Sequence, residues 1–154
     1  MKFTKSNKGI LKLSKNVISS MNEFVQDEKY KDEAGGVLLG RFILNTKDII
    51  VDKVTIPLYG DLRSRYQYIR ESDNHQKLII DAWNKSAGTC NYLGEWHTHP
   101  ENYPNPSSQD LKNWKEILNT RTFSSQYLYF VIVGIEEIRV WEGYKRKLKI
   151  KRIK

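Results

Sequence analysis

Hydrophobic residues recur with helical spacing in three stretches of the chain. After Ser14, which is a suitable N-cap, they fall at positions i, i+1, i+4, i+7 and i+8. A second helix is predicted over 75–86, capped by Ser72 or Asp73 and ended by Gly88, and a third over 107–119. The apolar faces predicted for the three helices are Val17, Ile18, Met21, Phe24 and Val25; Leu78, Ile79, Ala82 and Trp83; and Leu111, Trp114, Ile117 and Leu118.

Shorter apolar runs between these helices are typical of strands. The run over 127–135 is almost entirely apolar, which indicates a strand buried on both faces. A turn is expected at 45–48, an irregular link at 58–64 and another turn near Glu142 and Gly143. The other strands are predicted at 9–13, 36–44, 49–56, 66–70, 91–99, 138–141 and 147–151. This order predicts one α/β domain over residues 1–154, with a mixed β-sheet flanked by helices.

The strand over 91–99 carries the candidate chemistry at its end. Residues i and i+2 of a strand point to the same face, so His97 and His99 can reach one point before Pro100 ends the ladder. Ser107 and Asp110 follow closely, and two imidazoles with one carboxylate form a ligand set typical of catalytic Zn²⁺. The alternatives are an exposed strand end and a helix-capping pair at Ser107 and Asp110 that needs no metal. Capping and metal binding are compatible, because a helix beginning at Ser107 places Asp110 in its first turn.

The combined spacing is more specific than its parts. The tetrapeptide HTHP at 97–100, followed by Ser-x-x-Asp at 107–110 and preceded by EAGG at 33–36, resembles the JAMM motif of the JAB/MPN metalloprotease family. The longer string GEWHTHPE at 94–101, with PNPS before the aspartate and a tryptophan after it, is similar to a bacterial branch encoded in anti-phage CBASS operons. Arg70 and the His75–Gln76 pair also fit that branch.

The resemblance implies an MPN-like fold and a role for each residue of the motif. His97, His99 and Asp110 would hold one Zn²⁺, Glu33 would move the proton of the attacking water, and Ser107 would donate a hydrogen bond to the developing oxyanion. The implied reaction is hydrolysis of the amide bond after the C-terminus of a conjugated, ubiquitin-like protein. In the CBASS branch the conjugated protein is a cGAS-like nucleotidyltransferase that a ubiquitin-transfer-like enzyme attaches to its targets. The sequence does not indicate substrate-binding residues.

Three other functions compete with this interpretation. A JAB-type peptidase that processes another ubiquitin-like or sulfur-carrier protein would use the same residues. A nucleobase deaminase needs a Pro-Cys-x-x-Cys pair, and the chain has only Cys90. A catalytically silent MPN scaffold or a basic binding module is the alternative of another class, but silent members usually lack a ligand and every motif position is filled here.

Four further residues near the motif have predicted roles. Asp32 competes with Glu33 as the catalytic acid, and only the spacing to the glycines favours Glu33. His75 is expected to cap a helix or face solvent rather than bind zinc. Trp96 is expected in the core, on the face opposite the histidines. Glu95 shares their face, where it either orients an imidazole N–H or is hydrogen-bonded elsewhere.

Composition limits the partners and the compartment. The 154 residues contain no apolar run of the roughly 18–20 residues that span a bilayer, and residues 1–15 lack a signal-peptide core, so a cytoplasmic protein is expected. The net charge of +8 is local, because seven basic residues follow Glu142. They are Lys145, Arg146, Lys147, Lys149, Lys151, Arg152 and Lys154. Lysines that guard an edge strand are expected here rather than a nucleic-acid site, with an acidic partner as the alternative.

Overall fold

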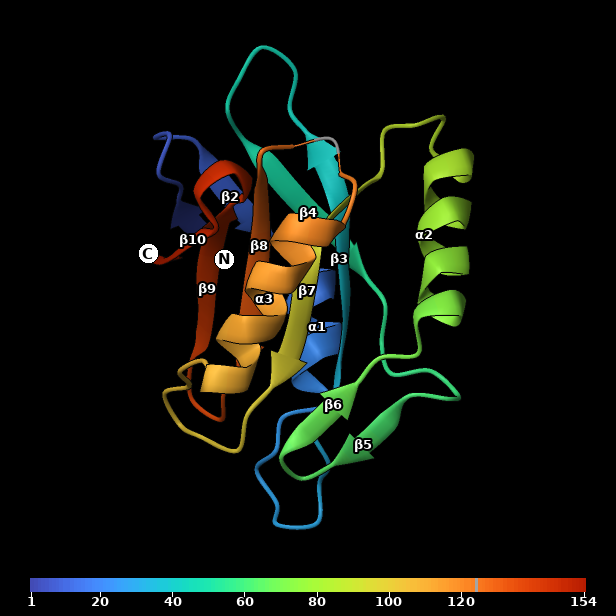
Figure 1. Ribbon diagram of the computed structural model, residues 1–154, viewed down its shortest axis with the longest axis vertical. Helices are drawn as coiled ribbons and strands as arrows, with labels where there is room; N and C mark the ends of the chain where they lie inside the picture. The colour runs from blue at the N-terminus through green and yellow to red at the C-terminus, as the bar shows by residue number, and fades with distance from the viewer. Residues whose placement is uncertain (124) are drawn as a thin grey trace.

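The computed structural model describes residues 1–123 and 125–154, whose strands form a curved sheet with helices on both faces (Figure 1). The elements in chain order are β1 (Lys2–Thr4), β2 (Ile10–Leu13), α1 (Lys15–Asn22), β3 (Gly35–Phe42), β4 (Ile49–Val54), β5 (Leu62–Ser64), β6 (Gln67–Ile69), α2 (Ser72–Lys85), β7 (Asn91–Thr98), α3 (Ser108–Thr120), β8 (Tyr127–Val133), β9 (Ile138–Tyr144), the short 3-10 helix η1 (Lys145–Lys147) and β10 (Lys149–Ile153).

The sheet is mixed, as the order of elements predicts. In the described part of the chain its strand order is β1-β2-β4-β3-β7-β8-β9-β10, and β5 and β6 form a separate hairpin. The pairs β2–β4 and β7–β8 are parallel and the other pairs are antiparallel. The backbone N–H of Thr4 donates to the carbonyl of Lys154 at 2.6 Å, so the sheet curls until its first and last strands meet.

Strand β8 lies inside the sheet, between β7 and β9, and separates two apolar layers. Its residues Tyr129, Val131 and Val133 pack into the cluster that contains Val17 and Met21 of α1. The alternate residues Leu128, Phe130 and Ile132 pack against Trp114 and Leu118 of α3. The prediction of a strand buried on both faces is therefore confirmed, and α1 covers one face of the sheet while α3 covers the other (Figure 1).

A backbone irregularity in β7 decides which side chains share a face. Gly94 has φ +141°, and the register between β3 and β7 shifts beside it. A Cβ at Gly94 would lie 1.8 Å from the carbonyl oxygen of Tyr129, so only glycine fits. Leu93 and Trp96 consequently both enter the cluster under α1, which confirms the prediction that Trp96 is a core residue. Glu95 and His97 line the opposite side, toward α3.

Several predicted boundaries were wrong. The link over 58–64 contains β5, and β1 was not predicted. The turn expected at Glu142 and Gly143 lies inside β9; the chain turns instead through η1, which ends at Leu148 with φ +45°. The N-cap of α2 is Glu71, whose carboxylate accepts from the N–H groups of Asp73 and Asn74.

The predicted buried face of α2 is confirmed only in part. Ala82 is buried in a small cluster with β3 and Ile79 packs against it, whereas Leu78 and Trp83 are 40% and 43% exposed. His75 is fully buried, so the expected capping or solvent role is wrong. The helix stands at the margin of the sheet (Figure 1), and its buried residues are His75 and Ala82. The amphipathic pattern of the sequence does not by itself show which residues of the helix face the sheet.

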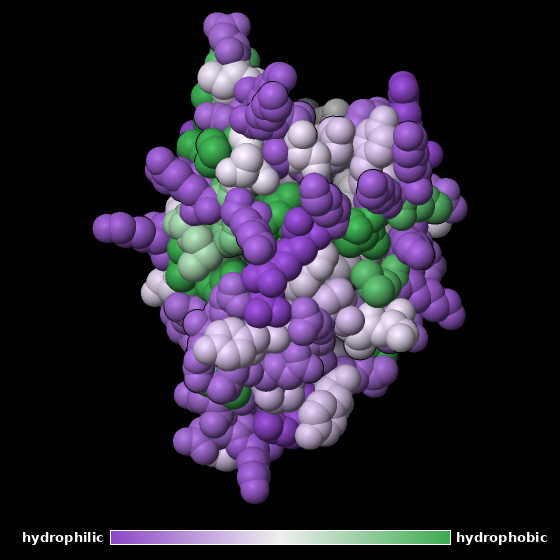
Figure 2. Space-filling model, turned by 90° about the vertical axis from the view of Figure 1, so that its left-hand side faces the viewer, coloured by the Kyte–Doolittle hydropathy of each residue, from purple (hydrophilic) through white to green (hydrophobic). Residues whose placement is uncertain are grey.

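The basic segment forms the outer strand β10, with Lys149 and Lys151 exposed. The side of the molecule seen in Figure 2 is mostly hydrophilic, and its hydrophobic residues appear in small separate groups. This agrees with a solvated outer strand. None of the helices in residues 1–123 and 125–154 combines the length and apolar character needed to cross a bilayer.

Candidate metal centre

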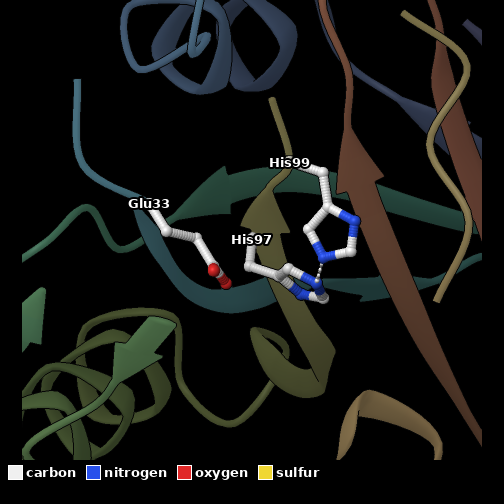
Figure 3. Close-up of side chains that lie close together, drawn as sticks. All are labelled: Glu33, His97 and His99. Atoms are coloured by element: carbon white, nitrogen blue, oxygen red, sulfur yellow. Dashed lines mark hydrogen bonds between the residues drawn. The ribbon is translucent and has the colours of Figure 1, made fainter. Parts of the chain in front are cut away.

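The two histidines at the end of β7 turn their Nε2 atoms toward each other. These atoms lie 3.0 Å apart, and the two rings are tilted rather than stacked (Figure 3). The backbone N–H of His99 donates to the carbonyl of Val133. This bond fixes His99 one residue beyond Thr98, the last residue of β7 that pairs with β8. Both side chains are largely buried, with 10% and 12% of their surface exposed.

Asp110 reaches the histidines from the first turn of α3. Its Oδ1 lies 3.5 Å from Nε2 of His97, and its Oδ2 lies 3.4 Å from Nε2 of His99. Ser107 is the N-cap of α3, and the pair forms a capping box: the Ser107 N–H donates to Oδ2 at 2.7 Å, and the Asp110 N–H donates to the Ser107 hydroxyl at 3.1 Å. The capping interpretation is confirmed, and the same box aims the carboxylate at the histidines.

Glu33 approaches from the loop before β3 and points its carboxylate toward His97 (Figure 3). One oxygen lies within 4.8 Å of the donor atoms of both histidines. The Glu33 backbone is fixed by the hairpin: its N–H donates to the carbonyl of Ser64 at 2.8 Å, and its carbonyl accepts from Arg63 Nε at 2.9 Å. A Cβ at Gly35 would lie 2.5 Å from the ring of Tyr68, so a glycine two residues after Glu33 lets Tyr68 of β6 pack against this segment.

A second network supports the histidine strand from the other face. The N–H of Ala34 donates to the Thr98 hydroxyl at 3.0 Å, and this hydroxyl donates to Gln26 at 3.0 Å. The Gln26 amide group in turn donates to the carbonyl of Arg65 at 2.8 Å. The segments that carry Glu33 and the histidines are therefore joined through buried hydrogen bonds, which limits their relative movement.

The pKa values of the two acidic groups at the centre, Glu33 and Asp110, are shifted in opposite directions. Burial raises the pKa of Glu33, against the opposing effect of the two histidines. Burial also acts to raise the pKa of Asp110, but the facing His97 and His99 and the Ser107 hydroxyl outweigh it and hold this pKa far below its usual range. Burial acts to lower the pKa of His99, but Asp110 and, more weakly, Glu33 and Glu101 raise it overall. Positive charge is thus favoured between the imidazoles and the carboxylates.

The donor set fits a tetrahedral divalent ion. Ligand bonds of about 2.0–2.2 Å place neighbouring donors of a tetrahedral Zn²⁺ roughly 3.3 Å apart. The two Nε2 atoms are 3.0 Å apart, His97 Nε2 is 3.5 Å from Asp110 Oδ1 and His99 Nε2 is 3.4 Å from Asp110 Oδ2, so each of these separations is close to that value. Glu33 is the more distant acid, within 4.8 Å of the histidines. Nitrogen and carboxylate donors are also the types that Zn²⁺ accepts.

Pockets open on both sides of the centre. The first has a volume of about 660 Å³ and lies between the hairpin residues 65–69 and the start of α3, with His99 and Ser107 in its wall. The second has a volume of about 410 Å³ and runs from His97 along the groove between β7 and α3. Glu33 and Asp110 line both pockets, so a chain lying across the centre has space on either side.

Of the other polar residues near the motif, Asp32 is exposed and lies outside the group formed by Glu33, His97 and His99, whereas Glu95 and His75 have partners of their own. Glu95 accepts from Arg70 at 2.6 Å and from the hydroxyl of Tyr92 at 3.2 Å, so it is hydrogen-bonded away from the imidazoles. His75 is not part of the group formed by Glu33, His97 and His99; it contacts Asp61 and Thr55 instead.

Sequence reasoning missed the residues that support the Glu33 segment. Arg63 bonds to the Glu33 carbonyl, Tyr68 packs against Gly35, and Gln26 bonds to the neighbouring Arg65 and Thr98. The polar link predicted at 58–64 gave no periodic signal for the short strand β5, whose backbone holds Glu33.

Comparison with known proteins places the chain in a family. The profile described as "Prokaryotic homologs of the JAB domain" matches residues 14–144. A curated relative from Pseudomonas aeruginosa (strain BWHPSA011 / Pa011), named CD-NTase/cGAS isopeptidase, is 35% identical over 83% of this chain and 79% of its own length. A relative of the same name from Vibrio cholerae is 33% identical over 85% of this chain and 79% of its own length. The solution structure of a protein from Desulfitobacterium hafniense shares the fold, with a TM-score of 0.63 and 18% identity over 92% of this chain and 88% of that one.

The chain therefore belongs to the prokaryotic JAB-domain family, and the resemblance to the CBASS-associated JAB/MPN branch is confirmed. The mixed sheet flanked by helices is the fold expected of that family.

Proposed function

We propose that this chain is a zinc-dependent isopeptidase that hydrolyses the amide bond after the C-terminus of a conjugated protein. The names of the relatives support a cGAS-like nucleotidyltransferase as that protein. In this account the enzyme reverses a bond made by a ubiquitin-transfer-like enzyme during anti-phage defence. The single observation that carries the reaction class is the convergence of His97, His99 and Asp110 beside Glu33.

His97, His99 and Asp110 are the proposed ligands, because the two Nε2 atoms lie 3.0 Å apart and each is within 3.5 Å of one oxygen of the Asp110 carboxylate. A bound Zn²⁺ would supply Lewis acidity and lower the pKa of a bound water to about 7. The capping box keeps Asp110 in place for this role, since the carboxylate is held by the backbone N–H of Ser107.

Glu33 is the proposed proton carrier. Its carboxylate accepts a proton from the attacking water as the water oxygen bonds to the amide carbon. It then delivers that proton to the amine nitrogen as the carbon–nitrogen bond breaks. Burial raises the pKa of Glu33, which suits a group that must both accept and release a proton.

Ser107 is the proposed donor to the oxyanion. Its hydroxyl now donates to Asp110 Oδ2 at 2.7 Å, and it has only one proton to give. That carboxylate oxygen also accepts from the Ser107 N–H, so it keeps a partner when the hydroxyl proton rotates toward substrate. The Asp110 N–H holds the hydroxyl oxygen in position meanwhile.

The larger pocket is the proposed site for the extended tail of the conjugated protein. Strand β6 lines it and, within the described chain, is paired only with β5. Its other edge offers backbone groups to an extended peptide. A JAB-type processing peptidase for another ubiquitin-like or sulfur-carrier protein would use the same surface, and a panel of conjugates separates the two.

Glu33→Gln tests the reaction most simply. The substrate is a cGAS-like nucleotidyltransferase carrying a protein joined through an amide bond to its C-terminus. We expect the zinc-loaded wild type to release the extension, and Glu33→Gln to be slower by about 10²–10⁴-fold, because proton transfer is lost while the ligands remain. Zinc content is measured on the same samples. Equal rates for the two proteins, or release that a chelator leaves unchanged, would contradict the proposal.

A further inference from the structure

Five residues line both pockets and so surround the point where a substrate chain would cross the metal centre. They are Glu33, Tyr68, Ile69, Asp110 and Asn113. Glu33 and Asp110 have roles in the proposed reaction, the hydroxyl of Tyr68 donates to Asp61, and Ile69 is apolar. Of these five residues, Asn113 is therefore the polar one to which the proposed reaction gives no role.

Helix α3 presents Asn113 beside a proposed metal ligand. Asn113 follows Asp110 by three residues, and side chains at i and i+3 lie on the same face of a helix. Asn113 is exposed, whereas the next residue, Trp114, is buried against β8 and holds the helix on the sheet. On the same helix, Gln109 lines only the larger pocket and Glu116 only the smaller one. Asn113 thus lies on the accessible wall where the two pockets meet.

The neighbouring Gln109 fixes the orientation of the Asn113 amide. Its Nε2 donates to Asn113 Oδ1 at 2.7 Å. Within residues 1–123 and 125–154 this is the only hydrogen bond of the Asn113 side chain, so both N–H groups of Nδ2 remain available. The carboxylates of Glu33 and Asp110 line the same two pockets and favour an amide that turns its N–H groups, rather than its oxygen, toward the centre.

The surrounding charges decide the kind of acceptor that Nδ2 would bind. Glu33 and Asp110 flank the crossing point, and Glu116 follows in the smaller pocket. These acids would repel a substrate carboxylate or phosphate, whereas an uncharged carbonyl oxygen would not be repelled. A peptide chain that crosses the metal centre carries carbonyl oxygens on both sides of the bond to be cut, so it supplies a suitable acceptor at the crossing.

We propose that the Asn113 amide is a substrate-positioning donor that binds one peptide carbonyl of the conjugate where the chain passes from one pocket to the other. This inference rests on the proposed isopeptidase function and adds a point of attachment close to the cleaved bond. Because the amide is uncharged and bonds to a carbonyl that is not itself attacked, its loss weakens the binding of substrate and transition state alike.

Asn113→Leu removes the amide with little change of shape. Leucine is nearly the size of asparagine but has no hydrogen-bonding group, and it is the better helix former, so the fold is retained. We expect KM to rise by about three- to tenfold through loss of one uncharged hydrogen bond, with kcat changed by less than about twofold. Steady-state kinetics on the amide-linked conjugate measure both constants.

Asn119→Leu is the matched control. Asn119 is another exposed asparagine of α3, and it lines neither pocket. This variant should have the KM of the wild type, and both variants should hold one zinc ion and melt no lower than the wild type. An Asn113→Leu protein with the same KM as Asn119→Leu would overturn the proposal.

Asn113→Ala addresses a steric effect of the leucine. Alanine removes the amide and leaves the crossing wider. If Nδ2 binds substrate, Asn113→Ala raises KM about as much as Asn113→Leu does. If only the leucine variant raises KM, the effect is obstruction of the crossing and the proposal is wrong.

Thioamide substitution identifies the carbonyl. The probe is a synthetic amide-linked conjugate built on the C-terminal peptide of a cGAS-like nucleotidyltransferase. One carbonyl at a time, other than the one at the cleaved bond, is converted to a thioamide, whose sulfur is a weaker acceptor. Fluorescence anisotropy measures binding to zinc-loaded Glu33→Gln, with Asn113 or with Asn113→Leu. We expect one position to weaken binding with Asn113 and to have no effect with Asn113→Leu.

The outcomes distinguish the two proposals. Equal thioamide effects with both proteins at every position would overturn the Asn113 contact while leaving the isopeptidase intact. Failure of the wild type to hydrolyse the parent conjugate would remove the proposed function and the contact with it.

Discussion

At the scale of single residues, Ser107 combines a structural role and a chemical role in one side chain. It caps α3 and, in the proposed reaction, donates to the oxyanion. We expect Ser107→Ala to lower kcat by about 10²–10³-fold through loss of that donor. The same change should lower the free energy of unfolding by about 1 kcal/mol through loss of the cap. Steady-state kinetics and urea unfolding measure the two effects separately.

Two further substitutions at the same position serve as controls. Glycine is tolerated at an N-cap at a cost of only a few tenths of a kcal/mol, so Ser107→Gly should keep the stability and still lose the rate. Ser107→Thr keeps a hydroxyl and should retain most of both. A Ser107→Gly protein with a wild-type rate would show that the hydroxyl does not act in the reaction.

The separation between residues in the chain determines what the sequence reveals about the centre. His97 and His99 follow from strand alternation, and Ser107 and Asp110 follow from helix capping, because both rules are local. Glu33 lies far away in the chain and comes close only because Gly35 pairs with His97 across β3 and β7. Only the family resemblance indicates it in advance, since a long-range register cannot be read from local patterns.

At the scale of elements, the bulge in β7 is the feature on which the site depends most. We expect Gly94→Ala to destabilise the protein by at least about 3 kcal/mol, because a Cβ would be strained at φ +141° and would overlap the Tyr129 carbonyl. Gly143→Ala in β9 is the matched control, since its Cβ would meet side-chain atoms of Leu118 and Phe130 rather than backbone, and its φ is not in the left-handed region. Urea unfolding should give a clearly smaller loss for Gly143→Ala; equal losses would contradict this role for the bulge.

A buried polar network attaches the hairpin segment to α2. Asp61 accepts from Tyr68 at 2.8 Å and contacts His75 Nε2 at 3.1 Å, and His75 Nδ1 lies 2.7 Å from the hydroxyl of Thr55. Burial acts to raise the pKa of Asp61, but hydrogen bonds from the Leu58 and Glu71 backbone and from His75 and Tyr68 outweigh it. They hold this pKa below its usual value.

This network predicts a dependence of stability on pH. Because the folded-state pKa of Asp61 is depressed, its contribution is fully present above the unfolded value of about 3.9 and is lost as pH falls through the folded pKa. Asp61→Asn should therefore cost about 1–3 kcal/mol near neutral pH, and the difference from wild type should shrink below about pH 4. Unfolding free energies measured across pH test this. Asp81→Asn, at an exposed ion pair with Lys85, should change little at any pH.

The elements that sequence patterns predicted well are those with strong periodicity and local signals. The helix over 107–119, the strand at 127–135 and the cap at Ser14 are confirmed within a few residues. The hairpin strand β5 was not predicted, and the buried side of α2 was predicted only in part. Both depend on tertiary contacts: β5 is short and polar, and α2 packs at the margin of the sheet through Ala82 and His75.

At the scale of the whole molecule, the candidate centre joins three segments that lie far apart in the chain. The loop before β3 brings Glu33, β7 brings the histidines, and α3 brings Asp110. The sheet register and the buried Gln26–Thr98 hydrogen bond bring these segments together. The excess positive charge, by contrast, is concentrated on the outer strand β10 and the preceding turn.

The zinc content of the protein tests the central claim most directly. Protein loaded with zinc and freed of excess metal should contain one ion per chain by elemental mass spectrometry. His97→Ala and Asp110→Ala should contain little or none, because each removes a proposed ligand, and Glu33→Gln should retain one. A wild type without zinc, or ligand variants that retain a full equivalent, would contradict the metal centre and the hydrolysis proposed from it.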